Sequence, residues 1–141
     1  MSEKKYINLN EKIFVAGATG MVGNAVCKTL TCAGYGSNKY GGEILKPVRK
    51  ELNLLDTKSV NDWFHAHKPT VVVLAAAKVG GIHANTIYPA DFIYQNLKIQ
   101  TNIIEASWRN GVKRFIFLGS SCIYPKFANQ PIEEESLLSG S

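Results

Sequence analysis

The stretch KIFVAGATGMVG, residues 12–23, decides the fold that the sequence predicts. Residues 12–16 are short, apolar and partly β-branched, which is typical of a buried strand. Glycines follow at positions 17, 20 and 23, and apolar residues recur at helical spacing from Met21 to Ala33, where Gly34 ends the pattern. A strand, a glycine turn and a helix in this order predict a βα unit that binds the pyrophosphate of a dinucleotide.

Each glycine of this turn has its own expected role. Gly17 permits the sharp turn, Gly20 lets the backbone approach a pyrophosphate, and Gly23 lets the helix pack closely on the strand. The free N–H groups at the helix N-terminus then meet the phosphate charge. The coenzyme contacts expected here are Gly17, Ala18, Thr19, Gly20, Met21, Val22 and Gly23. A glycine turn without a ligand is the alternative.

Strands and helices alternate along the rest of the chain. The expected strands are residues 12–16, 44–48, 52–55 (short), 71–74 and 114–118. Residues 71–74 show no polar alternation, so both faces of that strand should be buried in a parallel sheet. Helices are expected between Asp56 and Pro69 and at about residues 89–110. We therefore predict an α/β fold, a Rossmann-type doubly wound parallel sheet that is incomplete and holds about the first five strands.

The composition fits one ordinary globular domain. The chain has 141 residues, of which 45% are hydrophobic and 19% charged, which excludes a disordered tail or a disulfide scaffold. No apolar run approaches the ~20 residues of a membrane helix and the N-terminus is polar, so we expect a cytoplasmic protein with no membrane contact. Three cysteines without CxxC spacing argue against a metal site. The net charge of +5 fits a phosphorylated ligand, and the scatter of the basic residues argues against nucleic acid.

The exit of the second strand bears on the choice of coenzyme. A carboxylate there favours the ribose 2′-hydroxyl of NAD, whereas a cation accommodates the 2′-phosphate of NADP. Arg49 and Lys50 occupy this exit and favour NADP(H), unless both are merely solvated. Asp56 either reaches the adenine as well as capping its helix or only caps the helix.

The end of the last strand carries the candidate catalytic groups. Ligands of open α/β sheets bind beyond the carboxyl ends of the strands, where the segment GSSCIYP at residues 119–125 lies. On an extended chain the side chains of Ser120 and Cys122 would project together. A hydroxyl there can polarise a carbonyl, and a thiol of lowered pKa can exchange a proton with carbon. Packing alone is the alternative for both residues.

Several segments together resemble the GDP-L-fucose synthase family of extended short-chain dehydrogenases/reductases. They are ELNLLD at residues 51–56, LAAAKVGGI at 74–82, YPADFI at 88–93 and LGSSCIYPK at 118–126. The resemblance implies NADPH as coenzyme and GDP-4-keto-6-deoxy-D-mannose as substrate, which is epimerised at C3 and C5 and then reduced at C4 to GDP-L-fucose. It also implies a homodimer of the full-length enzyme, with helix 89–110 in the contact unless the apolar face of that helix covers the sheet instead.

The resemblance also implies roles for individual residues. Ser120 would be the serine of the Ser-Tyr-Lys set and Cys122 the epimerisation base. The remaining coenzyme contacts would be Ala75, Ala77, Leu118 and Gly119, and the contacts to the sugar Lys78, Val79 and Gly80. The alternatives are another extended family member that acts on a nucleotide sugar and a non-catalytic dinucleotide-binding module.

The Tyr-x-x-x-Lys segment of the family has no well-placed match in the chain. Residues 35–39 and 94–98 fit the pattern but lie away from Ser120 in the predicted topology. We therefore expect residues 1–141 to be the N-terminal part of an NAD(P)-binding Rossmann domain whose substrate domain is absent. Alone, this piece should be marginally stable and catalytically inactive.

Overall fold

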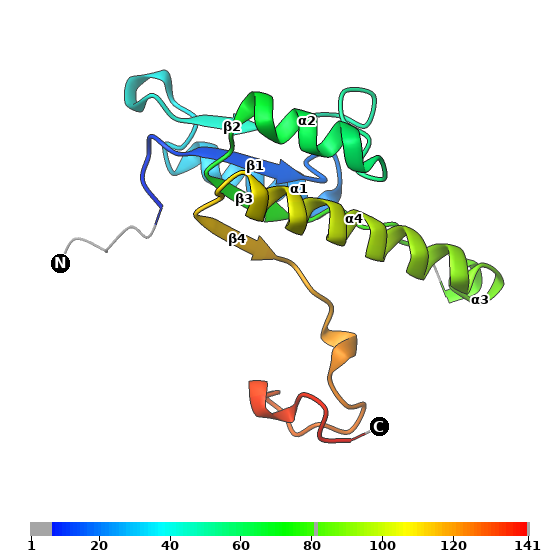
Figure 1. Ribbon diagram of the computed structural model, residues 1–141. Coiled ribbons are helices and arrows are strands. Elements are labelled where there is room, and N and C mark those ends of the chain that lie inside the picture. The colour runs from blue at the N-terminus through cyan, green and yellow to red at the C-terminus, as the bar shows by residue number, and fades with distance from the viewer. Residues whose placement is uncertain (1–6, 81, 141) are drawn as a thin grey trace.

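The computed structural model of the chain describes residues 7–80 and 82–140 and contains one parallel sheet (Figure 1). Its strands are β1 (Lys12–Ala16), β2 (Glu43–Leu45), β3 (Val71–Leu74) and β4 (Arg114–Phe117). Their order is β2-β1-β3-β4, and every pairing is parallel. The chain therefore reverses its direction of travel across the sheet between β2 and β3, which puts a topological switch point beside β1.

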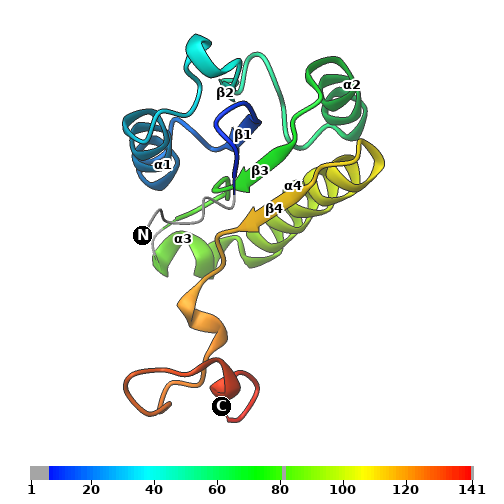
Figure 2. The same cartoon turned by 90° about the vertical axis from the view of Figure 1, so that its left-hand side faces the viewer.

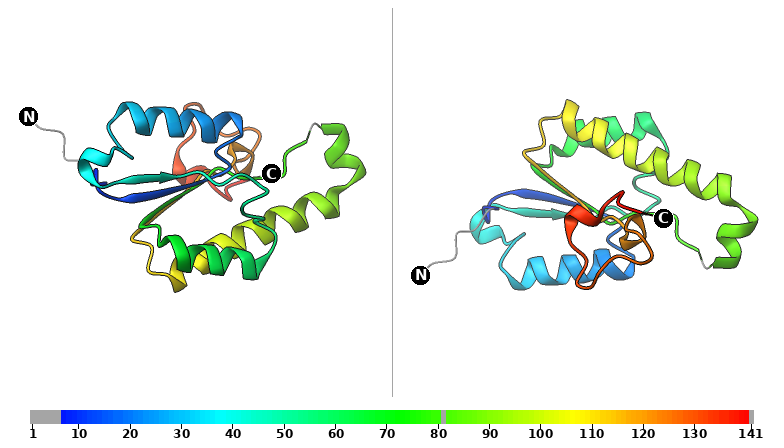
Figure 3. Two further views of the ribbon diagram at one scale, coloured as in Figure 1. Left: turned by 90° about the horizontal axis from the view of Figure 1, so that it is seen from above. Right: turned by 90° about the horizontal axis from the view of Figure 1, so that it is seen from below.

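Helices cover both faces of the sheet, as the doubly wound prediction requires. The described helices are α1 (Met21–Cys32), α2 (Thr57–His67), α3 (Ile82–Ile87) and α4 (Pro89–Arg109), of which α3 lies beside the far end of α4, beyond the sheet (Figure 1). Helix α1 lies on one face, and α2 and α4 lie together on the other (Figures 2 and 3). The Rossmann-type α/β fold is thus confirmed. In the described part of the chain, no helix is both long and apolar enough to cross a membrane.

Two apolar clusters hold the layers together, one on each face of the sheet. Phe14 on β1 and Val72 on β3 pack with Phe64 of α2 and Ile103 of α4. Val15 and its neighbours on the opposite face pack against α1. Because successive side chains of a strand point to opposite faces, the unbroken apolar runs of β1 and β3 supply both clusters.

The sheet has four strands in the described part of the chain, and the predicted strand at residues 52–55 is wrong. Local hydrogen bonds use two backbone donors of this segment: the Leu52 N–H donates to the Val48 carbonyl (3.0 Å), and the Leu55 N–H donates to Oδ1 of Asn53 (3.2 Å). Leu52 is nevertheless buried in the core. The apolar residues of this segment therefore serve packing, not a sheet ladder. Strand β2 is also shorter than predicted, because Pro47 has no N–H to donate to a ladder.

The long helix α4 presents an apolar face to solvent. Its side chains Ile93, Leu97, Ile104 and Trp108 are all more than half exposed, whereas a different face, with Ile103, is buried. Of the two alternatives for this apolar face, coverage of the sheet is therefore wrong, and the contact in a homodimer stays a prediction.

Candidate coenzyme site

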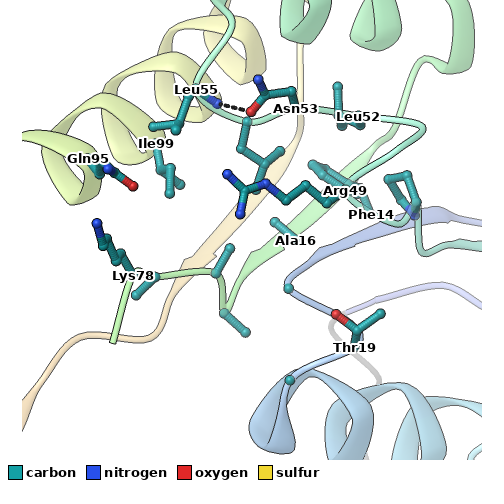
Figure 4. A pocket seen from close by; sticks show the side chains of 17 residues that line it. Phe14, Ala16, Thr19, Arg49, Leu52, Asn53, Leu55, Lys78, Gln95 and Ile99 are labelled. Carbon is teal, nitrogen blue, oxygen red and sulfur yellow. Dashed lines mark hydrogen bonds between the residues drawn. The ribbon is translucent and has the colours of Figure 1, made fainter. Parts of the chain in front are cut away.

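A cavity of about 510 Å³ opens at the carboxyl ends of β1 and β3, beside the switch point (Figure 4). Five parts of the chain form its wall, namely strand β1, the glycine turn, the segment after β2, the segment after β3 and one side of α4. The lining residues are Phe14, Ala16, Gly17, Thr19, Gly20, Pro47, Arg49, Leu52, Asn53, Leu54, Leu55, Ala75, Ala76, Ala77, Lys78, Gln95 and Ile99. Its place in the fold is the one where open α/β sheets bind ligands.

The glycine turn has a backbone that other residues could not adopt. Gly17 has a φ of +85°, and a Cβ there would lie 2.8 Å from the backbone of Ala76. A Cβ on Gly23 would lie 2.1 Å from the carbonyl oxygen of Gly17, so α1 packs directly on the turn. Gly20 precedes the first turn of α1 and supplies no side-chain cap, which leaves backbone donors there for an anion.

The two cations after β2, Arg49 and Lys50, differ in their position relative to the cavity. The Arg49 side chain points into the cavity (Figure 4). Lys50 is exposed and is not among the described lining residues. Of these two cations, only Arg49 is thus placed to meet a ligand in the cavity.

The carboxylate of Asp56 serves as a helix cap. Its Oδ1 accepts hydrogen bonds from the N–H groups of Lys58 (3.0 Å) and Ser59 (3.2 Å), and its Oδ2 accepts one from the Ser59 hydroxyl (2.9 Å). These hydrogen bonds, with the Ser59 hydroxyl first, lower the pKa of Asp56. Its neighbour Leu55 lines the cavity and Asp56 does not, so capping is the role that the geometry supports.

The segment after β3 is bound to α4. The main-chain N–H of Ala75 donates to the carbonyl of Ala16 (3.0 Å), which extends the sheet ladder. Three residues further on, the Lys78 ammonium forms an ion pair with Asp91 and lies 4.9 Å from the centre of the Phe92 ring. The hydrogen bond from Lys78 lowers the pKa of Asp91. Lys78 therefore lines the cavity with its charge already paired.

The other residues expected to touch the sugar lie further out. Val79 is 84% exposed, and neither Val79 nor Gly80 lines the cavity in the described part of the chain. Ala75 and Ala77 do line it, as predicted for coenzyme contacts.

The predicted catalytic segment follows β4 and leaves the sheet (Figure 1). Residues 121–123 form a 3-10 turn, in which the N–H of Tyr124 donates to the carbonyl of Ser121 (3.1 Å). The extended backbone expected between Ser120 and Cys122 is therefore wrong, because local turn bonds replace a ladder partner. Ser120 is described but does not line the cavity, nor do Leu118 and Gly119, and the side chain of Cys122 lies outside the described part.

Several lining residues were not predicted. Asn53 and its apolar neighbours occupy the segment mistaken for a strand, and Gln95 and Ile99 lie on α4. The spacing of Gln95 and Ile99 by four residues places both on one side of a helix, which is the only sequence signal that could have paired them. Among the described residues, no group of histidine, cysteine and carboxylate side chains could hold a metal ion.

A glycine turn that feeds a helix N-terminus, beside a cavity at the switch point of a doubly wound sheet, defines a dinucleotide-binding Rossmann protein. The sequence pattern described as the NAD dependent epimerase/dehydratase family matches residues 13–141, and the chain belongs to this family.

Individual relatives show which enzymes of this family the chain is similar to. The chain is 52% identical over 129 residues to a putative GDP-L-fucose synthase 2 of Arabidopsis thaliana, and 50% identical over 131 residues to the GDP-L-fucose synthase of Escherichia coli strain K12. These matches cover 92% and 93% of the chain but only 38% and 39% of the relatives. The chain thus corresponds to the N-terminal portion of GDP-L-fucose synthase homologues.

A solved structure agrees with this placement. The NADP-bound structure of MlghC, a GDP-mannoheptose C4 reductase from Campylobacter jejuni, superimposes with a TM-score of 0.83 at 37% identity. The match covers 96% of this chain and 41% of that one.

Proposed function

We propose that the cavity binds NADP(H) and that the chain is the coenzyme-binding part of an epimerase/reductase of the GDP-L-fucose synthase type. The observation that carries this proposal is the packing of Gly17 against the backbone of Ala76 and of Gly23 against Gly17. A side chain at either glycine would force apart the turn whose backbone N–H groups would meet a pyrophosphate at the start of α1. Arg49 supplies a positive charge inside the same cavity for the 2′-phosphate of NADP.

The substrate proposed from the relatives is GDP-4-keto-6-deoxy-D-mannose, and the product is GDP-L-fucose. The bound coenzyme would supply a hydride. Of this chain's own groups, the Ser120 hydroxyl would donate a hydrogen bond to the C4 ketone. The Cys122 thiolate would take a proton from C3 or C5, the carbons next to the ketone, and an acid in the remainder of the enzyme would deliver a proton to the opposite face of the same carbon.

The rest of the proposal concerns the whole enzyme. The chain spans about two fifths of its relatives, so we propose that the substrate domain and the tyrosine-lysine pair belong to the remainder. Residues 1–141 alone should therefore bind coenzyme without turnover. A homodimer of the full-length enzyme and a cytoplasmic location remain predictions.

A titration with NADP⁺ and NAD⁺ tests the coenzyme proposal. We expect the 141-residue chain to bind NADP⁺ more tightly than NAD⁺. Arg49→Ala should weaken NADP⁺ binding about tenfold, the size of one charge-assisted hydrogen bond, and leave NAD⁺ binding nearly unchanged. Lys50→Ala is the matched control, because Lys50 lies one residue away and does not line the cavity. Equal affinity for the two coenzymes, or equal effects of the two substitutions, would contradict the preference for NADP.

A turnover assay tests the proposal that residues 1–141 alone are catalytically inactive. The chain alone should consume no NADPH with GDP-4-keto-6-deoxy-D-mannose. Turnover above that of a Ser120→Ala control would contradict the proposal that the remainder of the enzyme is needed.

A further inference from the structure

Helix α4 lies along the cavity and contacts two of its walls. Gln95 and Ile99 of this helix line the cavity themselves. Two asparagines on the same helix, Asn96 and Asn102, do not line it but hold segments that do. These two carboxamides have no role in the chemistry proposed above.

Asn96 bonds both backbone polar groups of one cavity residue. Its Oδ1 accepts a hydrogen bond from the N–H of Lys78 (2.7 Å), and its Nδ2 donates one to the carbonyl of Lys78 (3.0 Å). A carboxamide has one acceptor and two donors, so it can satisfy this pair of backbone groups as a neighbouring strand would. Lys78 lies beyond the end of β3 at Leu74, where the chain has no strand partner in the described sheet.

Asn102 holds the opposite wall in a similar way. Its side chain is almost fully buried, with 3% of the residue exposed. Its Nδ2 donates to the carbonyl of Leu54 (2.8 Å), and its Oδ1 accepts from the Thr57 hydroxyl (2.9 Å). Leu54 lies in the turn segment after β2, which forms no strand in the described sheet and packs against the core cluster on this face.

We propose that Asn96 and Asn102 are positioning residues that set the width of the coenzyme cavity by tying its two walls to one helix. This inference rests on the proposed function, because it assigns the cavity to NADP(H). Asn96 fixes the wall formed by residues 75–78, and Asn102 fixes the wall formed by residues 52–55. Loss of the hydrogen bonds made by either asparagine lets one wall move without removing any group that lines the cavity. Coenzyme affinity should therefore fall while the glycine turn stays intact.

Asn96 is the better residue to test, because it is only half-buried and its loss leaves the core unchanged. Asn96→Ala should weaken NADP⁺ binding by the 141-residue chain about tenfold, as expected for two lost hydrogen bonds. In the same variant, NMR should detect faster hydrogen exchange at the Lys78 amide. Asn110→Ala is the matched control, since the Asn110 carboxamide bonds only the Ala106 carbonyl (2.8 Å) at the far end of α4. It should change neither quantity.

The two hydrogen bonds between the Asn96 carboxamide and the backbone of Lys78 form a clamp, and Asn96→Asp tests them separately. A carboxylate keeps the acceptor for the Lys78 N–H and loses the donor for the Lys78 carbonyl. The Lys78 amide should therefore stay protected in this variant while NADP⁺ binding is still weakened. This variant also keeps the inference testable if Asn96→Ala does not fold.

The outcomes distinguish the inference from the proposed function. NADP⁺ affinity of Asn96→Ala within about twofold of the wild type would overturn the positioning role. Unchanged exchange at Lys78 would overturn the clamp itself. A wild-type chain that binds no NADP⁺ would contradict the proposed function, and the exchange contrast between Asn96→Ala and Asn110→Ala would still decide whether the clamp exists.

Discussion

Strands β3 and β4 are hydrogen-bonded neighbours of similar apolar character, and they differ in burial. All four residues of β3 are at most 5% exposed, whereas Phe117 of β4 is 50% exposed. Strand β3 has a strand on each side and helices over both faces, while β4 pairs with β3 alone in the described sheet. The difference shows that an apolar strand is buried by its neighbours in the sheet and not by its own composition.

The same difference separates the two functional regions. The glycine turn and the cavity lie beside the buried strands β1 and β3, where both walls are fixed by hydrogen bonds. The segment with Ser120 follows β4 and extends away from the sheet (Figure 1). The candidate coenzyme cavity thus lies among the buried strands, and the segment with the predicted catalytic residues lies outside the described sheet.

The largest contrast should come from a charge placed in each strand. Val72→Asp buries a carboxylate at a site with no exposure and should cost at least about 4 kcal/mol, enough to leave the chain unfolded. Phe117→Asp should change the free energy of unfolding by less than about 1 kcal/mol and reduce aggregation, because charged edges resist pairing. Urea denaturation and light scattering measure the two effects. Similar losses of stability in both variants would contradict the difference in burial between β3 and β4.

Glycine substitutions should give the next largest contrast. Gly23→Ala places a methyl group 2.1 Å from the Gly17 carbonyl oxygen and should cost about 3 kcal/mol and abolish NADP⁺ binding. Gly111→Ala meets nothing within 4 Å and strains only a φ of +70°, so about 1 kcal/mol should be lost and binding kept. Calorimetric titration and chemical denaturation test both. Tight binding by Gly23→Ala would contradict the turn's role.

Two adjacent isoleucines on α4 give a smaller contrast within one helix. Ile103 is fully buried, so Ile103→Ala should lower the free energy of unfolding by about 3 kcal/mol. Ile104 is 51% exposed, so Ile104→Ala should change it by no more than about 0.5 kcal/mol. Thermal and urea unfolding measure both. A large loss in Ile104→Ala would mean that the exposed face of α4 is covered in solution, for example by a second copy of the chain.

The smallest effect should come from the cap of α2. Asp56→Ala removes the acceptor for two N–H groups and should lower the melting temperature by a few degrees, whereas Asp56→Asn keeps a capping side chain and should lower it less. The pKa of Asp56 is lowered in the folded protein, so its contribution is complete above the ordinary aspartate pKa of about 3.9 and is lost as the pH falls through the lower folded value. The difference between wild type and Asp56→Ala should therefore shrink at acid pH. A difference that grows on acidification would contradict the cap.

The first βα unit, the central strand β3 and the alternation of strands and helices could all be predicted from the sequence. These features depend on contacts close in the chain, namely apolar periodicity, helix ends and the glycine positions of the turn. Arg49 is expected at the cavity because strand ends meet at one edge of a parallel sheet, and the family resemblance places Ala75 and Ala77 there; all three line the cavity.

The roles of the other residues depend on contacts between segments that lie far apart in the sequence. The apolar run at residues 52–55 packs in a turn segment because its backbone donors bond locally, and the exposed face of α4 is the one that periodicity alone would have buried. The pairing of Asn96 with Lys78, and of Asn102 with Leu54, joins residues 18 and 48 positions apart. Such pairs depend on how helix and loop pack against each other, and local sequence carries no signal for that.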